Sequence, residues 1–323
     1  MSQLLFKKLR EDINKEMHLS FDKCETALGL DMMLYQTGLN SGSNEDAQGK
    51  RFRPMLCLLT ALALKVDHKK VLPAAAAIEL IHNFSLIHDD IQDEDEFRRG
   101  RMTLWKKRGI SQAINAGDAM HSLSNIALNR LFEKGFSGDV INSVSFAINY
   151  SCFQMCEGQV LDVEFEKIPS VSFEKYLEMI TKKTAFLIQA GPLSAALIGT
   201  HDKNIIERFS NFGMNLGIAF QIFNDVSGFK GNPKDKFNHF ASDLKKNKKS
   251  LPVILALKNK KILAKKHNAV KLFKLIEESG AVFQARKIGD EYFGQALFEL
   301  EKTKIKNSYS RLLLQYISKV REV

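Results

Sequence analysis

Three aspartates that follow an apolar segment are the residues in this chain best suited to chemistry. The segment from His82 to Thr103 reads HNFSLIHDDIQDEDEFRRGRMT and contains Asp89, Asp90 and Asp93. On a helix, Asp89 and Asp93 share a face one turn apart, and Asp90 lies about 100° around the axis. Because clustered carboxylates repel one another, a hard divalent cation such as Mg²⁺ is their expected partner.

Two arginines, Arg98 and Arg99, follow these aspartates closely. A guanidinium group offers a planar set of donors that matches phosphate oxygens. Magnesium in proteins is commonly held by one or two carboxylates together with substrate phosphates. Carboxylates that can bind a metal, followed by arginines that can bind the same phosphate, therefore predict a diphosphate site. The competing interpretation is a solvated acidic helix end followed by a basic turn, and the apolar residues before the aspartates disfavour it.

The rest of the chain has the composition of a helical globular protein. It contains 323 residues, of which 45% are hydrophobic and 26% are charged, with only 6 prolines and 19 glycines. So few turn formers disfavour an all-β sandwich. Apolar residues recur at helical spacing, and we predict helices over residues 56–64, 74–93, 125–136, 140–160, 176–197, 204–229 and 251–266. Without a linker or a repeat, these ranges predict one all-α domain over residues 1–323.

The formal net charge is +10, which suits a polyanionic partner. No RNP, zinc-finger or helix-turn-helix pattern accompanies the basic residues, so we expect no nucleic-acid binding. The apolar runs are shorter than a membrane span, and the N-terminal segment lacks the apolar core of a secretory signal. We therefore expect a cytoplasmic protein without a transmembrane segment.

The aspartate segment resembles the first aspartate-rich motif of the trans-isoprenyl (polyprenyl) diphosphate synthases, in its short DDxxD form with RRG behind it. Further motifs of that family stand in the family's order along the chain. They are GKRxRP at Gly49–Pro54, GD at Gly117-Asp118, GQxxD at Gly158–Asp162, KT at Lys183-Thr184, FQ at Phe220-Gln221, and the basic segment Asp243–Pro252. The resemblance runs from about Gly49 to Leu257.

This resemblance implies an isoprenoid-synthase-like helical bundle around a deep central cavity, usually a homodimer, that uses Mg²⁺. The implied reaction ionises an allylic prenyl diphosphate, after which the double bond of isopentenyl diphosphate attacks the cation and a proton is lost. Both diphosphates are thus the implied partners. Any membrane contact is expected to be peripheral and to serve product release.

The resemblance also implies roles for individual residues. The implied metal ligands are Asp89, Asp90, Asp93, Asn224 and Asp225. The implied substrate-binding residues are Arg98 for the allylic diphosphate, Lys50, Arg51, His82 and Arg99 for isopentenyl diphosphate, and Lys248 as a further phosphate lysine. The residues implied at the reaction centre are Lys183, on the diphosphate, and Thr184 and Gln221, whose oxygens stabilise the cation. His82 lies two helical turns before Asp89 and shares its face; the alternative is an ordinary core histidine.

The second aspartate motif departs from the family's usual DDxxD, because the corresponding residues are Asn224-Asp225-Val226-Ser227-Gly228. Asparagine offers a metal a neutral oxygen without a charge. A class I terpene cyclase is one alternative, but its (N/D)Dxx(S/T)xxxE motif fails at Gly228 and Asn232. A non-catalytic partner subunit of a heteromeric synthase is another, although the intact first motif counts against it. We favour chain elongation over both.

Two residues before the first motif are candidates for setting product length. Phe84 and Ser85 precede Asp89 by five and four positions, so both lie roughly 6–8 Å below it along a helix. An aromatic side chain here would block the growing prenyl tail. In the family that the chain resembles, an aromatic residue at this place beside the short DDxxD form is typical of short-chain synthases, so the resemblance implies a short-chain product, geranylgeranyl diphosphate before farnesyl diphosphate. If Phe84 is only core packing, the floor comes from a neighbouring helix, for instance from Met120 or Leu123.

Overall fold

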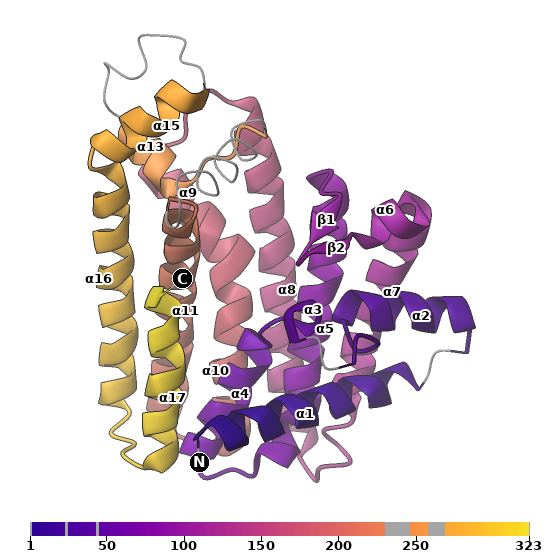
Figure 1. Cartoon of the computed structure of the whole chain (residues 1–323). Helices are drawn as coiled ribbons and strands as arrows, with labels where there is room; N and C mark the ends of the chain where they lie inside the picture. Colours follow the sequence, from indigo (N-terminus) through magenta and orange to yellow (C-terminus); the bar gives the residue numbers. More distant parts are fainter. Residues whose placement is uncertain (1, 23–24, 43–44, 230–245, 258–268, 323) are drawn as a thin grey trace. The chain divides into compact units, whose positions relative to one another are not determined.

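The computed structural model describes residues 2–22, 25–42, 45–229, 246–257 and 269–322, most of them in helices (Figure 1). Backbone contacts divide the chain into two compact units. Unit 1 comprises Met1–Asn149, Ala190–Ile206 and Ile305–Leu313, and unit 2 comprises Tyr150–Gln189, Glu207–Lys304 and Leu314–Val323.

Unit 1 is built from the N-terminal half of the chain. Its own elements are α1 (Ser2–Phe21), α2 (Ala27–Thr37), α3 (Glu45–Gln48), α4 (Phe52–Ala63), α5 (His68–Gln92), β1 (Phe97–Arg98), β2 (Arg101–Met102), α6 (Leu104–Arg108) and α7 (Ile110–Asn129). Four further helices contribute residues to both units: α8 (Gly138–Lys167), α10 (Phe186–Gly199), α11 (Lys203–Ser227) and α17 (Ser308–Ser318).

Helix α5 forms the core of unit 1. It begins after Asp67, whose side chain accepts a hydrogen bond from the Lys69 N–H and so satisfies a free donor of the first turn. The alanines of Ala74–Ala77 are fully buried, and α1, α4 and α7 pack against the helix. Within the described part of the chain, α5 is the one helix long and apolar enough to cross a membrane, but 72% of its apolar stretch is buried inside the protein.

A short hairpin follows the end of α5. Strands β1 and β2 pair antiparallel, with Phe97 opposite Met102 and Arg98 opposite Arg101. Between them, Arg99 and Gly100 both have positive φ, 52° and 71°, the combination that a two-residue type I′ turn requires. This turn brings Arg98 back to the aspartates at the end of α5.

Arg51 joins several helices of unit 1 from a fully buried position. Its Nη1 donates to Glu79 Oε1 of α5 at 2.9 Å, its Nη2 to the Thr37 carbonyl of α2 at 2.8 Å, and its Nε to Asn14 Oδ1 of α1 at 3.0 Å. Every nitrogen of the guanidinium thus has a partner inside the protein, and Arg51 connects the start of α4 to three other helices.

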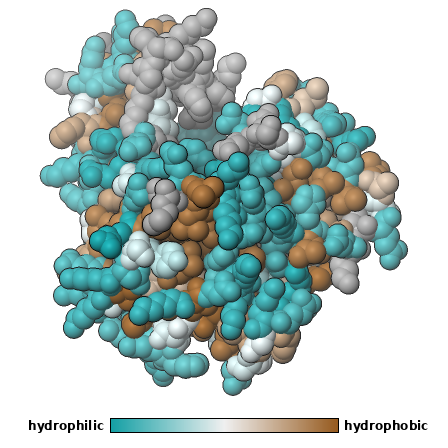
Figure 2. Space-filling model, turned by 60° about the horizontal axis from the view of Figure 1, so that its bottom comes forward, coloured by the Kyte–Doolittle hydropathy of each residue, from teal (hydrophilic) through white to brown (hydrophobic). Residues whose placement is uncertain are grey.

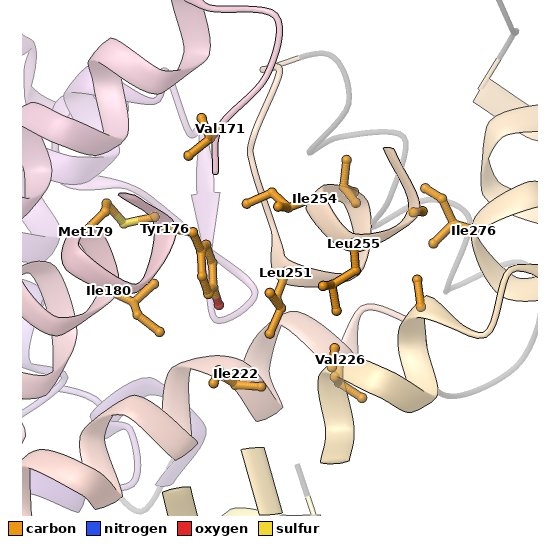
Figure 3. Close-up of a cluster of buried hydrophobic side chains, with 14 of the residues drawn as sticks. Val171, Tyr176, Met179, Ile180, Ile222, Val226, Leu251, Ile254, Leu255 and Ile276 are labelled. Atoms are coloured by element: carbon orange, nitrogen blue, oxygen red, sulfur yellow. The ribbon is translucent and has the colours of Figure 1, made fainter. Parts of the chain in front are cut away.

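Unit 2 has its own elements besides the shared helices. They are α9 (Phe173–Ile180), the π-helix η1 (Thr181–Ala185), α13 (Leu251–Leu257), α15 (Ala269–Glu278), α16 (Ala281–Lys302) and the 3₁₀-helix η2 (Lys319–Glu322). Its core gathers buried side chains from α9, α11, α13 and α15, among them Tyr176, Ile222, Leu251 and Ile276 (Figure 3).

The π-helix η1 is packed closely by glycines of two neighbouring helices. A Cβ atom on Gly158 of α8 would collide with the backbone of Lys183, and one on Gly217 of α11 would collide with Ala185. π-Helical turns of this kind are frequent at functional sites. Here the two glycines allow α8 and α11 to approach the turn that carries Lys183 and Thr184.

The predicted helices agree with the structure except near residues 110–136. We predicted a helix over residues 125–136, but α7 covers Ile110–Asn129 and turns follow it. The buried face of its first half consists largely of small residues, Ala113, Ala116 and Gly117, so apolar periodicity did not reveal it. The range 258–266 lies outside the described residues.

The buried ion pair of Arg51 and Glu79 generates a stability prediction. Arg51→Leu should lower the free energy of unfolding by about 3 kcal/mol, because it leaves the Glu79 carboxylate buried without its cation. Urea unfolding followed by circular dichroism measures the change. The exposed neighbour Lys50 is the matched control, and Lys50→Leu should stay within about 0.5 kcal/mol of the wild type. Equal effects of the two substitutions would show that the buried pair does not stabilise unit 1.

Candidate active site

The aspartates at the end of α5 surround one arginine of the following hairpin. The Arg98 Nε donates to Asp90 Oδ1, and the Arg98 Nη2 lies 3.4 Å from Asp89 Oδ2 and 3.7 Å from Asp95 Oδ2. Asp93 caps the C-terminus of α5, where the helix dipole is also negative. The structure thus brings Asp89 and Asp90, two of the three predicted aspartates, together with Arg98 as their counter-ion.

The electrostatics of this cluster reflect its burial. Asp90 is only 1% exposed, and burial raises the pKa of its carboxyl to about 6 against the opposing charge of Arg98. Burial by itself lowers the pKa of a guanidinium, but Asp90, Asp89 and Asp95 outweigh it, so the pKa of Arg98 is raised. The Asp90 carboxylate therefore depends on the charge of Arg98 to stay ionised.

The donor chemistry of this cluster fits a hard divalent cation. In the described part of the chain, no three acidic, histidine or cysteine side chains converge into a ready metal cage. The oxygens of Asp89, Asp90 and Asp93 are the kind that such cations prefer, and the Asp89 side chain is 22% exposed. A bound cation would share these oxygens with Arg98.

A second cluster in unit 1 has the opposite charge. We call Arg53, His82 and Arg99 the arginine–histidine cluster. Arg53 Nη1 lies 3.3 Å from His82 Nε2, and the buried Arg53 Nε has no hydrogen-bond partner among the described residues. Burial, opposed by Glu79 and supported by Arg99, lowers the pKa of Arg53 to about 10. Burial and then the surrounding arginines lower the pKa of His82 well below its usual value. The charges of Arg53 and Arg99 repel each other and disfavour the charged form of His82, so an anion would stabilise the cluster.

The structure places Arg53, and not the predicted Arg51, beside His82. Arg51 is committed to Glu79 and neighbouring backbone and amide groups, as described above, and Lys50 is exposed. The assignment of Arg51 and Lys50 to isopentenyl diphosphate stays a prediction. One signal for Arg53 was available in the sequence: it lies in the first turn of α4, and the N-terminal end of a helix favours anions.

Phe84, the predicted chain-length residue, packs between α5 and α7. Its ring contacts His88 edge-on at 4.9 Å between centroids and lies 5.4 Å from His121. Gly117 of α7 leaves room for His88, since a Cβ atom there would overlap the imidazole. The Ser85 hydroxyl donates to the His82 carbonyl of its own helix. The side chains of Met120 and Leu123, the alternative floor, are buried.

In unit 2, the two predicted phosphate lysines share one carboxylate. Asp162 Oδ2 lies 2.6 Å from Lys183 Nζ and 3.1 Å from Lys248 Nζ, and Lys248 also contacts Glu166 at 2.8 Å. Burial opposes ionisation of Asp162, but the two lysines prevail and lower its pKa. In the sequence, Asp162 ends the GQxxD motif and was given no role of its own. The structure shows that its carboxylate joins these two lysines.

The remaining predicted residues of unit 2 form a chain of hydrogen bonds. Thr184 Oγ1 donates to Gln221 Oε1 at 3.0 Å, and Gln221 Nε2 donates to Asp225 Oδ1 at 2.9 Å. Tyr176, which the sequence did not single out, donates to Asp225 Oδ2 at 2.8 Å. Asn224 is half-buried. The start of the basic segment, Asp243, lies outside the described residues.

The arginine–histidine cluster generates a pH-dependent prediction. In the free protein, the His82 imidazole should titrate below the usual range of histidine, because burial and positive neighbours disfavour its charged form. Saturating inorganic pyrophosphate should raise that pKa, since the anion offsets the charge of the arginines. Nitrogen NMR of the histidine rings measures both titrations, and His82→Gln assigns the signal. A titration curve unmoved by pyrophosphate would contradict anion binding at this cluster.

Comparison with known proteins agrees with this geometry. The polyprenyl synthetase family model matches residues 40–286. A geranylgeranyl diphosphate synthase of Saccharolobus solfataricus is 32% identical over 84% of this chain and 85% of the relative, and a geranylgeranyl pyrophosphate synthase of Geoglobus acetivorans is 37% identical over 79% and 81%. The solved geranylgeranyl pyrophosphate synthetase of Pyrococcus horikoshii superposes with a TM-score of 0.87 at 30% identity and covers 99% of both chains.

These relatives are prenyl diphosphate synthases, and they give no support to the cyclase or to the partner subunit. The matched region contains both aspartate motifs, the arginine–histidine cluster and the lysines on Asp162. The chain belongs to the polyprenyl synthetase family, has its all-α fold and is a short-chain trans-prenyltransferase.

Proposed function

We propose that this enzyme condenses isopentenyl diphosphate with an allylic prenyl diphosphate in a Mg²⁺-dependent reaction and releases geranylgeranyl diphosphate. The observation that carries the proposal is the pair of oppositely charged clusters in unit 1. Carboxylates surround Arg98, and Asp90 among them is buried. In contrast, acidic side chains compensate the positive charges of Arg53 and Arg99 beside His82 only in part. One cluster suits a metal-bound diphosphate, and the other suits a diphosphate bound directly.

Each cluster then has a part in the reaction. Asp89, Asp90 and Asp93 would hold Mg²⁺, which when bound neutralises charge on the leaving diphosphate. Arg98 holds the same allylic diphosphate through its guanidinium. The arginine–histidine cluster binds isopentenyl diphosphate through charge-assisted hydrogen bonds, and the neutral His82 donates one of them without adding a charge.

Unit 2 supplies the lysines and the neutral oxygens. Lys183 and Lys248 neutralise phosphate oxygens when they exchange Asp162 for the substrate. The oxygens of Thr184 and Gln221 carry partial negative charge and stabilise the allylic cation once diphosphate has left. Asn224 contributes a neutral oxygen where the family usually has a carboxylate, so the second motif binds a metal more weakly than the first.

The product assignment to geranylgeranyl diphosphate is supported by the names of the relatives and by Phe84. Both relatives named above are geranylgeranyl diphosphate synthases. In this chain, Phe84 stands one and a half turns before Asp89 with His88 and His121 against its ring. An aromatic wall at this depth limits the length of a tail that starts at the aspartates.

A homodimer is proposed from an exposed apolar stripe on α8. Phe146, Tyr150, Phe153 and Val160 are 70%, 44%, 56% and 60% exposed, and their spacing places them on one helix face like the seam of a coiled coil. Apolar side chains reach the surface elsewhere too, as brown areas in Figure 2 show, but this stripe follows one helix. The occupant we propose is the same stripe of a second copy.

A cytoplasmic location with peripheral membrane contact also belongs to this proposal. Its support is the chemistry of the reactants: the short diphosphates are soluble polyanions, whereas a twenty-carbon product has an apolar tail that favours lipid. The net charge of +10 favours approach to anionic membranes.

The first test concerns the metal. Asp89→Ala should lower kcat at least about 10²-fold, because a strong contact to the transition state is lost. Radiolabelled isopentenyl diphosphate incorporation measures the rate, and EDTA should abolish it until MgCl₂ is restored. Glu133→Ala removes an exposed carboxylate of the same unit and is the matched control. Full activity in EDTA, or in Asp89→Ala, would refute the proposed function.

The second test separates the two substrates. Arg53→Gln should raise the KM for isopentenyl diphosphate at least about tenfold, because a charged hydrogen bond worth about 1.5–3 kcal/mol is removed. The KM for the allylic substrate should change less than about threefold. Arg53→Lys, which keeps the charge but not the guanidinium geometry, should fall between. A parallel rise of both KM values would mean that Arg53 does not distinguish the substrates.

The third test concerns product length. Phe84→Ala, assayed with farnesyl diphosphate and excess isopentenyl diphosphate, should lengthen the product by one or more five-carbon units. Reversed-phase chromatography of the dephosphorylated products measures the distribution. Phe132→Ala, at an exposed phenylalanine of the same unit, should leave it unchanged. An active Phe84→Ala enzyme with the wild-type product would place the floor elsewhere, for instance at Met120.

A further inference from the structure

Asp225, which the family resemblance implied as a metal ligand, accepts hydrogen bonds from the protein itself on both carboxylate oxygens. Its Oδ1 accepts a hydrogen bond from Gln221 Nε2 at 2.9 Å, and its Oδ2 accepts from the Tyr176 hydroxyl and from the Leu251 N–H, both at 2.8 Å. These donors come from α11, α9 and the start of α13. Figure 3 shows Tyr176 and Leu251 within the buried cluster, next to the helix that carries Val226.

The chemistry of these bonds determines how the Gln221 amide is oriented. An ionised carboxylate only accepts hydrogen bonds, so the side of the amide that meets Asp225 must be its NH₂ group. The amide oxygen of Gln221 therefore points the other way, where it accepts the Thr184 hydroxyl at 3.0 Å. An amide orientation is usually ambiguous in a structure, but here a carboxylate on one side decides it.

The orientation of Gln221 in turn determines what Thr184 can offer. A hydroxyl has one proton and two lone pairs, and the proton of Thr184 is used on Gln221. Its lone pairs are what remain for a ligand. Thr184 lies in the π-helix η1 and is 6% exposed, so its hydroxyl has little water with which to exchange this arrangement.

We propose that Asp225 is a positioning residue and not a metal ligand: it orients the Gln221 amide, which turns the lone pairs of Thr184 toward the reacting cation. The part of this inference that concerns the cation rests on the proposed function. The part that concerns metal binding does not.

The local energetics favour this role over metal ligation. If Asp225 turned to a metal, it would leave the buried Tyr176 hydroxyl and the Leu251 N–H without an acceptor, at about 1–3 kcal/mol for each. Burial and then the charge of Asp225 raise the pKa of Tyr176 well above its usual value, so its hydroxyl stays a donor. Gln221 and Asp225 stand one turn apart on α11, which keeps their side chains in contact.

Asp225→Asn tests the inference because it changes one acceptor into a donor. The remaining oxygen of the new side chain keeps the bonds from Tyr176 and Leu251, but its NH₂ group faces the NH₂ group of Gln221. The Gln221 amide must then flip, so that its NH₂ group faces Thr184. The Thr184 hydroxyl now accepts a hydrogen bond from this NH₂ group, and its own proton points toward the cation. The double substitution Asp225→Asn with Gln221→Glu restores the original direction, because the new carboxylate accepts from both the amide and Thr184.

Three readouts are compared with the wild type: kcat and KM of condensation, the fraction of allylic substrate released as the water-captured alcohol, and Mn²⁺ binding by electron paramagnetic resonance with saturating pyrophosphate. Asp225→Asn should lower kcat at least about tenfold and increase the alcohol, with both KM values and the Mn²⁺ affinity within about twofold. The double substitution should recover most of kcat. Tyr176→Phe keeps the Gln221 bond and should change kcat less than about threefold.

Asp89→Asn is the positive control for Mn²⁺ and should weaken its binding at least tenfold. Equal weakening in Asp225→Asn would overturn the inference and make Asp225 a metal ligand. Failure of the double substitution to exceed Asp225→Asn in kcat would overturn the orienting role. If Asp225→Asn does not fold by circular dichroism, the double variant decides alone, since its bonds are restored. A wild-type enzyme without prenyl transfer would refute the proposed function, whereas the Mn²⁺ comparison would still test Asp225.

Discussion

The need to compensate negative charge at the end of α5 governs the structure of unit 1 around its site. Asp89, Asp90 and Asp93 stand where the helix dipole is already negative, and Asp90 is buried. An uncompensated buried carboxylate costs several kcal/mol, so the chain after α5 must return a cation. A hairpin with strands of only two residues does this through a turn at Arg99 and Gly100. Under the proposed function, a bound metal would extend the same compensation to a diphosphate.

The buried arginines of this unit differ in how far acidic partners compensate their charge. Arg51 has an ion pair with Glu79 and two further acceptors, so it gains little from an anion. Arg53 is as close to the start of α4, yet in the described part of the chain its Nε has no hydrogen-bond partner, and its pKa is lowered. An anion binds favourably where positive charge is present and acidic side chains do not compensate it. A buried arginine alone therefore does not mark a substrate site; its balance of partners does.

The fold was predictable where large apolar side chains define a buried face, as in α4, α5 and α11. It was not predictable over residues 110–124, because α7 meets α5 through Ala113, Ala116 and Gly117, which carry no periodic apolar signal. Position 117 requires glycine, because the His88 imidazole occupies the space that a Cβ atom would fill. The hairpin was not predicted for another reason: strands of two residues are too short to show an alternation of apolar and polar residues. Close packing and short strands both depend on partners distant in the sequence.

The same distinction applies to the site: contacts between residues close in the sequence were predictable, and contacts between distant residues were not. Spacing within one helix sufficed for Asp89 and Asp93, and for the nearness of Arg98, because these residues are neighbours in sequence. It could not show the surroundings of Asp225, whose Oδ2 accepts hydrogen bonds from Tyr176, 49 positions away, and from Leu251, 26 positions away. The same carboxylate would bind a metal if it faced solvent and orients an amide because it faces donors. Residue type states which chemistry is available, and the donors that packing brings to each oxygen determine which chemistry is used.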